Sequence, residues 1–273
     1  MPENRSNMPF SVDNHLALSE GSQIKHVIAV VSGKGGVGKS TVSANLAVAL
    51  ARQGLRVALV DADIYGPSIP TMFGIEDAKP EVTVKDEQEI IYPIERYGVK
   101  IISVGFFIAK NAGLIWRGPM VASFLTQLYE NTQWGDIDYL IIDFPPGTGD
   151  IQLTTMQKLN LSGIIMVTTP QDIAVNDARK AASMFNNPEL AIPILGVIEN
   201  MSWFTPKSHP EEKYFIFGKG GGETLAKELN IKLLGQIPLV AEVGEAADKG
   251  LSIFNQSDGN VVTIFEKIVE NIL

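Results

Sequence analysis

The stretch HVIAVVSGKGGVGKS, residues 26–40, decides the fold of this chain. Its first half is apolar, which predicts a buried strand at His26–Ser32. The residues that follow, Ser40–Arg52, place Val42 and Leu46 one turn apart, which predicts a helix with one buried face. A strand, a glycine-rich turn and a helix in immediate succession indicate the first unit of an α/β fold.

The turn itself, Gly33–Ser40, matches the pattern G-x-x-x-x-G-K-[ST], which is typical of loops that hold a nucleoside triphosphate. Small residues let backbone N–H groups close around a phosphate, and the start of the following helix adds partial positive charge. On this interpretation Lys39 reaches the β- and γ-phosphate oxygens, and the Ser40 hydroxyl ligates Mg²⁺. The alternative is a glycine-rich turn that contains a lysine by chance. The predicted nucleotide-binding residues of this region are Gly33, Lys34, Gly35, Gly36, Val37, Gly38, Lys39, Ser40 and Thr41.

Three aspartates follow predicted strands and are expected beside this turn. Asp61 and Asp63 lie at i and i+2 after one strand, so their side chains point the same way from an extended backbone. Asp143 ends another apolar strand. We expect Asp61 and Asp143 to hold Mg²⁺ through water molecules and Asp63 to orient the attacking water. The alternative for the first pair is an aspartate turn that caps the next helix. From these patterns, the predicted catalytic residues are therefore Lys39 and Asp63.

Short apolar runs alternate with helical patterns along the rest of the chain. This alternation predicts an α/β fold in three layers, a mostly parallel sheet with helices on both faces. We expect residues 1–25 to form a polar leader or linker and residues 26–273 to form one nucleotide-binding domain. The other expected strands are Arg56–Val60, Val99–Val104, Tyr139–Ile142, Gly163–Thr168 and Ile194–Ile198, with a hairpin at Glu81–Ile94; the other expected helices are Pro119–Thr132, Ala174–Asn186, Gly220–Leu229 and Gly259–Ile272.

The overall composition limits the possible classes of function. Among 273 residues, 22 Lys and Arg stand against 31 Asp and Glu, a net charge of −9. So acidic a chain is not expected to bind nucleic acid or an anionic membrane. No uncharged apolar run approaches the ~20 residues that span a bilayer, and no secretory signal is visible, so we expect a cytoplasmic protein. The chain has no cysteine, which excludes thiolate-bound metal clusters within it.

Several longer sequence motifs follow the glycine-rich turn along the chain. They are Asp61–Pro70 (DADIYGPSIP), Trp116–Met120 (WRGPM), Asp143–Thr154 (DFPPGTGDIQLT), Val167–Ala181 (VTTPQDIAVNDARKA), Glu199–Met201 (ENM) and Ile216–Pro238. In this order, from about Lys25 to the C-terminus, the sequence resembles the Mrp/ApbC family. These are MinD-like P-loop ATPases regarded as iron–sulfur cluster carriers.

This resemblance implies further properties. The protein would be a slow, Mg²⁺-dependent ATPase that forms a homodimer with two ATP molecules at the interface. By this resemblance Lys34 would be a third catalytic residue, which crosses that interface and touches the nucleotide of the other subunit. The alternative is a solvated surface lysine. Asn200 would hydrogen-bond the adenine and Pro238 would pack near it, although a turn role for Asn200 stays open. The expected partners are iron–sulfur apoproteins or assembly factors.

The sequence also departs from the family pattern. Family members usually place C-x-x-C just after the Glu-Asn-Met segment, and here Pro206 and His209 occupy those positions. One imidazole is a poor substitute for two thiolates, so no iron–sulfur ligand is identifiable and a bound cluster is left open. Relatives often carry a small additional domain before the ATPase, where this chain has the polar leader.

Three functions therefore remain in competition at this stage. The first is an ATP-hydrolysing homodimer in iron–sulfur cluster assembly, and the second is an ATP-gated scaffold without a cluster of its own. The third is a ParA/MinD-like partitioning ATPase on DNA or membrane. The last helix has an apolar stripe that includes Val261 and Phe265, but its charges Glu266, Lys267 and Glu270 do not make a basic face. We therefore expect this stripe to pack in the core rather than on a membrane.

Overall fold

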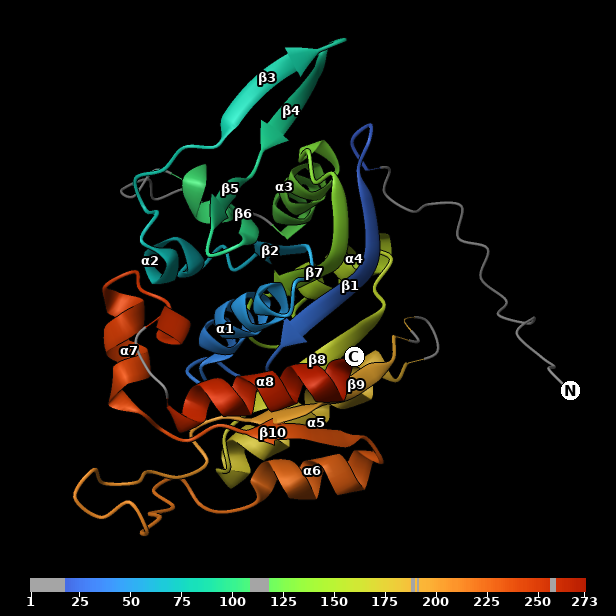
Figure 1. Ribbon diagram of the computed structural model, residues 1–273. Helices are drawn as coiled ribbons and strands as arrows, with labels where there is room; N and C mark the ends of the chain where they lie inside the picture. Colours follow the sequence, from blue (N-terminus) through green and yellow to red (C-terminus); the bar gives the residue numbers. More distant parts are fainter. Residues whose placement is uncertain (1–17, 109–117, 188–189, 191, 256–258) are drawn as a thin grey trace, which may run out of the picture.

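A central sheet of eight strands organises the molecule (Figure 1). The computed structural model describes residues 18–108, 118–187, 190, 192–255 and 259–273. The strand order is β10-β9-β8-β1-β7-β2-β6-β5, and neighbours are parallel except that β5 runs antiparallel to β6. The strands are β1 (Gln23–Val31), β2 (Val57–Asp61), β5 (Ile94–Arg96), β6 (Val99–Ser103), β7 (Asp136–Asp143), β8 (Gly163–Thr168), β9 (Ile194–Glu199) and β10 (Lys232–Gln236).

Helices cover both faces of this sheet. One buried cluster joins the sheet to α1 (Lys39–Arg52), α2 (Ile69–Phe73), α7 (Ala241–Asp248) and α8 (Asn260–Ile272). A second cluster on the opposite face joins it to α3 (Gly118–Asn131), α4 (Asp150–Lys158), α5 (Asp172–Phe185) and α6 (Gly221–Leu229). The expected three-layer α/β fold with a mostly parallel sheet is confirmed.

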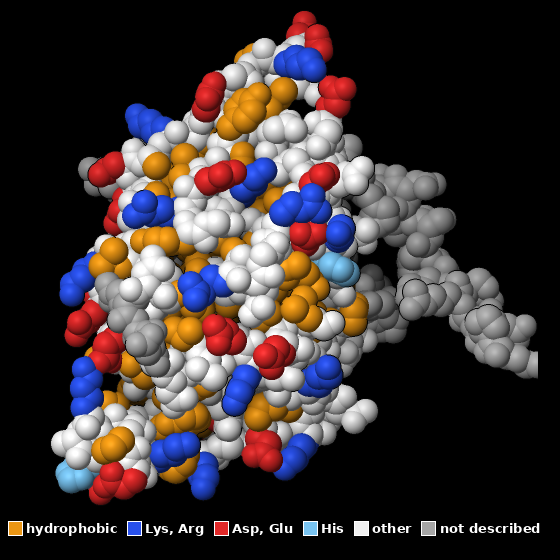
Figure 2. Space-filling model, viewed as in Figure 1, with side chains coloured by type: hydrophobic (Ala, Val, Ile, Leu, Met, Phe, Trp, Pro, Cys, Tyr) orange, Lys and Arg blue, Asp and Glu red, His pale blue; other side chains and the backbone are white. Residues whose placement is uncertain are grey.

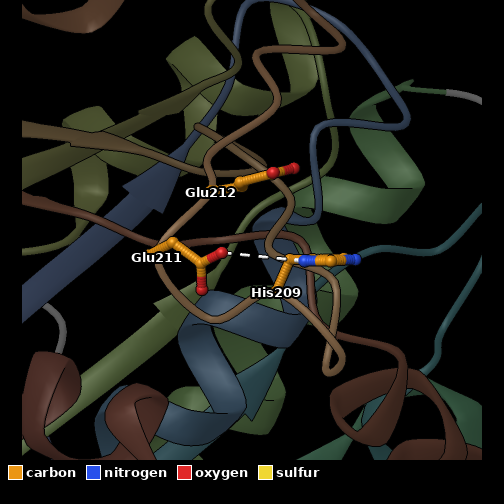
Figure 3. A group of neighbouring side chains, drawn as sticks. All are labelled: His209, Glu211 and Glu212. Carbon is orange, nitrogen blue, oxygen red and sulfur yellow. Dashed lines mark ion pairs between the residues drawn. The ribbon is translucent and has the colours of Figure 1, made fainter.

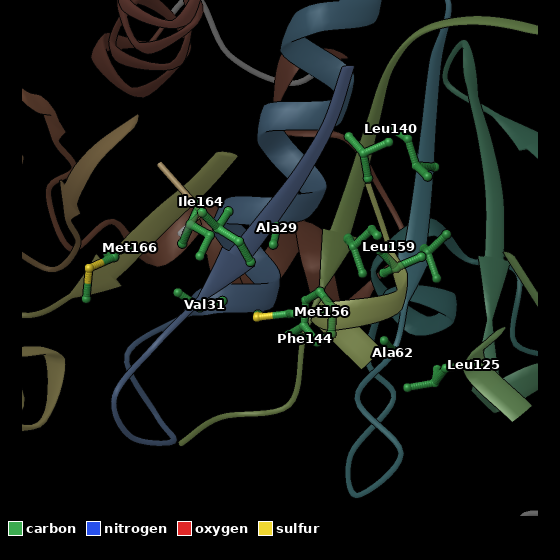
Figure 4. Close-up of a cluster of buried hydrophobic side chains, with 14 of the residues drawn as sticks. Ala29, Val31, Ala62, Leu125, Leu140, Phe144, Met156, Leu159, Ile164 and Met166 are labelled. Carbon is green, nitrogen blue, oxygen red and sulfur yellow. The ribbon is translucent and has the colours of Figure 1, made fainter. Parts of the chain in front are cut away.

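The sequence of β1 shows why its apolar run is continuous. Ala29 and Val31 belong to the cluster on the α4 side of the sheet, which also includes Phe144 and Met156 (Figure 4). Val30, which lies between them, and Ile28, which precedes Ala29, belong to the cluster on the other face. Because successive side chains alternate between two buried faces, every position favours an apolar residue.

A two-stranded hairpin stands apart from the sheet. β3 (Glu81–Lys85) and β4 (Gln88–Tyr92) pair antiparallel and project from the end of the molecule where β1 begins (Figure 1). Asp86 and Glu87 at its tip have φ of 51° and 66°, as a tight hairpin turn requires. The hairpin expected at Glu81–Ile94 is confirmed, although its second strand ends at Tyr92 and Ile94 belongs to β5.

The structure differs from the expected elements mainly at their polar ends. β1 already includes Gln23, inside the expected leader, and β7 begins at Asp136 rather than Tyr139. Gln23 and Asp136 are partners in the register of β1 and β7. The side chain of Lys25 forms an ion pair of 2.9 Å with Asp138. The strands therefore continue past the apolar core, where hydropathy gives no signal. The rest of the leader up to residue 17, and Trp116 with Arg117 of the WRGPM block, lie outside the described residues.

The C-terminal helix packs as expected. Val261, Phe265 and Ile268 of α8 are buried against the sheet and α1, so its apolar stripe is core. Among the helices that the structure describes, none combines the length and the hydropathy needed to cross a membrane. η1 (Val104–Phe106) and η2 (Ile253–Asn255) are short 3₁₀ turns that complete the described elements.

Candidate functional site

Two glycines fix the shape of the turn between β1 and α1. Gly38 has φ of 79° and caps the start of α1, and a Cβ there would lie 2.2 Å from Asn200 Nδ2. A Cβ on Gly33 would lie 2.2 Å from the backbone carbonyl carbon of Asp177 in α5. A side chain at either position would therefore collide with a neighbouring segment. Close approach of α5 and Asn200 therefore accounts for the glycines at positions 33 and 38.

This turn borders a cavity of about 210 Å³. The first residues of α1 lie at its floor, where the N-terminal N–H groups of a helix favour an anion. Lys34 is half-buried at its edge, and no described carboxylate lies within ion-pair distance of Lys34 Nζ. Gly33 is the one predicted residue of the turn that does not line the cavity. The lining residues are Ser32, Lys34, Gly35, Gly36, Val37, Gly38, Lys39, Ser40, Thr41, Asp63, Met72 and Pro146.

Asp143 lies beneath the cavity and accepts hydrogen bonds from side chains of α1. Lys39 Nζ lies 2.7 Å from its Oδ1, and Ser40 Oγ lies 2.5 Å from its Oδ2. Ser43 Oγ lies 2.6 Å from Oδ1, and both Asp143 and Ser43 are fully buried. The structure thus brings together the three predicted residues Lys39, Ser40 and Asp143. Ser43 was not predicted, although its position one helical turn after Lys39 was a usable signal.

Asp61 lies next to Asp143 in the strand register, but its oxygens are used for structure. Oδ2 accepts from Ser103 Oγ at 2.9 Å and from the backbone N–H of Ile69 at 3.2 Å, and Oδ1 accepts from the N–H of Asp63. These contacts fit the alternative of an aspartate that orders the turn before α2. A role of Asp61 in metal binding stays a prediction, and Ser103 is a second residue that the sequence did not indicate.

Asp63 faces the cavity from the opposite side. Its Oδ2 lies 4.0 Å from Lys39 Nζ, and its Oδ1 accepts from the backbone N–H of Tyr65 at 3.2 Å. This position opposite the glycine turn agrees with the expected role in orienting a water molecule, which the structure does not test.

Burial controls the ionisation of both acids near Asp143. Desolvation, followed by repulsion from Asp143, raises the pKa of Asp61 to about 8. Burial also raises the pKa of Asp63, while the ammonium of Lys39 opposes the increase. Asp143 and Asp63 thus lie 2.7 and 4.0 Å from Lys39 Nζ, and carboxylate oxygens are the ligands that suit a hard divalent cation.

A second cavity, of about 290 Å³, adjoins the first and shares Gly38 and Thr41 with it. Its walls are mostly apolar and include Asn200 and Pro238, which the resemblance assigns to the adenine. Asn200 is buried, and its Nδ2 donates to the carbonyl of Val37 at 2.9 Å. Asn200 therefore ties the end of β9 to the glycine turn, so the two cavities have a fixed relation.

The segment that replaces the family's cysteines forms a long loop between β9 and α6. Phe204 and Tyr214 pair across it, both N–H to carbonyl distances being 2.8 Å. His209 and Glu211 form an ion pair of 3.6 Å with Glu212 close by, and all three side chains are exposed (Figure 3). One imidazole and two carboxylates differ from the thiolates that hold iron–sulfur clusters.

Comparison with known proteins agrees with this geometry. Residues 23–273 match a ParA family model described as NUBPL iron-transfer P-loop NTPase. The iron-sulfur cluster carrier protein of Aquifex aeolicus is 51% identical over 249 residues, which are 90% of this chain and 67% of that protein. The iron-sulfur protein required for NADH dehydrogenase, mitochondrial, of Arabidopsis thaliana is 45% identical over 252 residues, 92% of this chain and 78% of that protein.

A solved structure extends the likeness to three dimensions. The nucleotide-binding protein of Archaeoglobus fulgidus, determined in complex with ADP, superimposes with a TM-score of 0.73 at 38% identity. The match covers 86% of this chain and 90% of that one. The expected resemblance is thus confirmed over residues 23–273. This chain belongs to the ParA family of iron-transfer P-loop NTPases.

Proposed function

We propose that this chain binds ATP with Mg²⁺, hydrolyses it to ADP and phosphate, and acts as a homodimer in the delivery of iron–sulfur clusters. The observation that carries the nucleotide part is the pair of cavities that meet at Gly38 and Thr41. One is bordered by backbone N–H groups and Lys39 for the phosphates, and the other offers apolar walls and an amide for the base.

The residues around the first cavity support hydrolysis. Ser40 Oγ and Asp143 Oδ2 would hold Mg²⁺, the latter through water, and the metal would neutralise the phosphate oxygens. Asp63 would orient a water molecule whose oxygen bonds to the γ-phosphorus as the bond to the β–γ bridging oxygen breaks. ADP and phosphate leave, and the proton of the water passes to solvent or phosphate. Positioning and charge compensation suffice for this reaction.

An exchange of partners accompanies ligand binding in this proposal. Lys39 Nζ lies on Asp143 at 2.7 Å, so the lysine must leave that carboxylate to reach a phosphate. Asp143 then needs another cation, and Mg²⁺ supplies it. Lys39 and the metal thus act as a pair. If either is missing, a buried charge is left without a counter-ion.

Phosphate release by purified protein tests the ATPase assignment. With ATP and Mg²⁺ present, we expect Lys39→Ala to lower the rate on the order of 100-fold, because it removes a charge that stabilises the transferred phosphoryl group. Lys180→Ala is the matched control, since Lys180 is exposed and pairs only locally with Asp177 within the described chain. Equal phosphate release by wild type and Lys39→Ala would refute the assignment.

Exposed apolar side chains near the cavity support the homodimer. Tyr65, just after Asp63, is 73% exposed, and Ile173, at the start of the helix that packs on Gly33, is 65% exposed. Large apolar side chains that are exposed to solvent favour contact with another surface. In a symmetric pair Lys34 would lie at the boundary and reach the nucleotide of the other subunit.

The names of the relatives support a role with iron–sulfur clusters as cargo. The chain spans about two thirds of the length of the A. aeolicus carrier, so the activity of that whole protein comes to this chain only as a proposal. Since this chain has no cysteine, any cluster would need ligands from His209, from carboxylates or from a partner protein.

A scaffold function is the second candidate, and the loop after β9 favours it. Tyr214, Phe215 and Ile216 are exposed there, and a groove of about 620 Å³ lies beneath Trp203 and Phe204. Anaerobic reconstitution with iron and sulfide separates the two candidates. A stable, stoichiometric chromophore favours the carrier, and its absence favours a nucleotide-gated scaffold that recruits another protein.

A partitioning role on DNA or membrane has less support. The face in Figure 2 carries lysines and arginines interspersed with acidic residues rather than gathered in one patch. The C-terminal stripe packs against the core. Flotation with anionic vesicles tests this alternative, and co-flotation in the presence of ATP would restore it.

A further inference from the structure

Glu199, the last residue of β9, is a buried carboxylate that the ATPase chemistry does not use. Only 1% of its surface is exposed. Its Oε2 accepts from the backbone N–H of Gly222 at 2.6 Å, and its Oε1 accepts from Gln236 Nε2 at 2.7 Å. The start of α6 adds partial positive charge at the first of these contacts. A carboxylate this deep is stable because both oxygens have donors.

The backbone of Glu199 makes two further contacts with the same region. Its carbonyl accepts from Ser202 Oγ at 2.9 Å and from the N–H of Ile237 at 2.8 Å. A Cβ on Gly222 would lie 2.7 Å from Glu199 Cβ, so α6 begins in direct contact with this residue. Glu199 therefore joins the end of β9, the segment after β10 and the start of α6.

Two of these segments, the one that follows β9 and the one that follows β10, line the second cavity, which would hold the base. Asn200 follows Glu199 directly, and Ile237 and Pro238 form the facing wall, while Glu199 itself does not line the cavity. The loop after β9 is tied to the same wall, because the N–H of Leu239 donates to the carbonyl of Trp203 at 2.7 Å. The carboxylate of Glu199, together with these backbone hydrogen bonds, thus holds Asn200 and the apolar wall in the relation in which they would enclose the base.

We propose that Glu199 is a positioning residue for recognition of the nucleotide base. This inference rests on the ATP binding proposed above. Glu199 acts through Asn200 and Pro238 and does not touch the phosphates, which are held by the glycine turn. Its loss therefore weakens the part of the affinity that depends on the base and leaves the part that depends on the phosphates.

Calorimetry with two ligands tests this separation. ATP and inorganic tripolyphosphate are titrated, with Mg²⁺, into the full chain of wild type, Glu199→Ala and Glu199→Gln. We expect Glu199→Ala to bind ATP about tenfold more weakly, because two hydrogen bonds to a charged group are lost, and to bind tripolyphosphate within about twofold of wild type. Glu199→Gln should keep most of the ATP affinity, since its carbonyl still accepts from Gly222 and Gln236 can rotate its amide.

The results that would contradict the positioning role can be told apart from those that would contradict nucleotide binding. ATP affinity unchanged in Glu199→Ala, or an equal loss for both ligands, would overturn the positioning role. If wild type binds neither ligand, the proposed nucleotide function falls together with this inference. If Glu199→Ala fails to fold, Gln236→Met is the second variant, because it removes only one partner of the carboxylate. We expect it to weaken the binding of ATP, but not of tripolyphosphate, by a smaller factor. An equal loss of affinity for both ligands in this variant would overturn the role.

Discussion

Asp143 matters both for the stability of the folded chain and for the proposed metal site. It ends β7, and it accepts from Lys39, Ser40 and Ser43 of α1 at 2.5–2.7 Å. A fully buried carboxylate would be strongly destabilising without such donors. The same residue would bind the metal through water, so its donors decide both how stable the folded chain is and how readily Asp143 exchanges a lysine for a divalent cation.

Ser43→Ala tests the contribution of the donor that the sequence did not indicate. We expect the free energy of unfolding to fall by about 1–3 kcal/mol, because the alanine leaves an oxygen of a buried carboxylate short of a donor. Urea denaturation measures this change. Ser183→Ala on α5 is the control, since its hydroxyl bonds only a backbone carbonyl at an exposed position within the described chain. Equal stabilities of the two variants would contradict the assigned role.

The pKa of Asp61 gives a pH dependence with a defined sign. Its pKa is about 8 in the folded chain and lies near the ordinary value of 3.8 when unfolded. Between these values the folded state binds the additional proton, so the free energy of unfolding decreases as the pH rises from about 5 to 8.5. Asp63 contributes with the same sign.

Urea denaturation without nucleotide, at several pH values in that window, measures the effect. Asp61→Asn should flatten the decrease, since the amide does not titrate. Asp138, whose pKa Arg56 holds well below its usual range, affects stability only at lower pH and does not interfere. A free energy of unfolding of the wild type that increases with pH over this window would contradict the raised pKa of the buried Asp61.

At the scale of secondary-structure elements, the close approach of α5 to the glycine turn is the most demanding contact. Gly33→Ala would place a methyl group 2.2 Å from the backbone of Asp177. We expect this variant to lose more than about 2 kcal/mol of stability, because either the turn or the helix must shift. Gly149→Ala is the control: apart from its chain neighbours, no described residue lies within 4 Å of an added Cβ, and its φ of −78° suits alanine. Thermal unfolding of both variants measures the difference, and equal melting temperatures would contradict it.

The same scale shows what the sequence can and cannot predict. The turn from Gly33 to Ser40, β8 and the three-layer arrangement follow from apolar periodicity and one motif. β10 and α2 were not predicted, because β10 mixes Lys232 and Gln236 with apolar residues and α2 is only five residues long. The contacts of Asp61, Ser43 and Glu199 depend on which strands become neighbours, and a single sequence carries no such information.

At the scale of the whole molecule, the proposed homodimer makes hydrolysis depend on protein concentration. We expect Mg²⁺ and ATP to shift wild type from the mass of one chain, 29.6 kDa, towards twice that value in size-exclusion chromatography with light scattering. Lys34→Ala should bind ATP with similar affinity, yet its phosphate release per chain should be at least about tenfold lower, since the cation supplied by the partner is gone. Lys180→Ala again serves as the control. A rate per chain that is independent of concentration in wild type would contradict the proposal.

The ion pair between Lys39 and Asp143 also bears on which form of the substrate enters. Before any ligand arrives, the Lys39 ammonium already serves as counter-ion for the buried Asp143, with Asp63 4.0 Å away. A bare triphosphate would have to displace that acid from its cation and leave it uncompensated. A triphosphate that arrives already bound to a divalent cation would bring the replacement with it. Under the proposed function the pocket would therefore select for the chelate over either component alone.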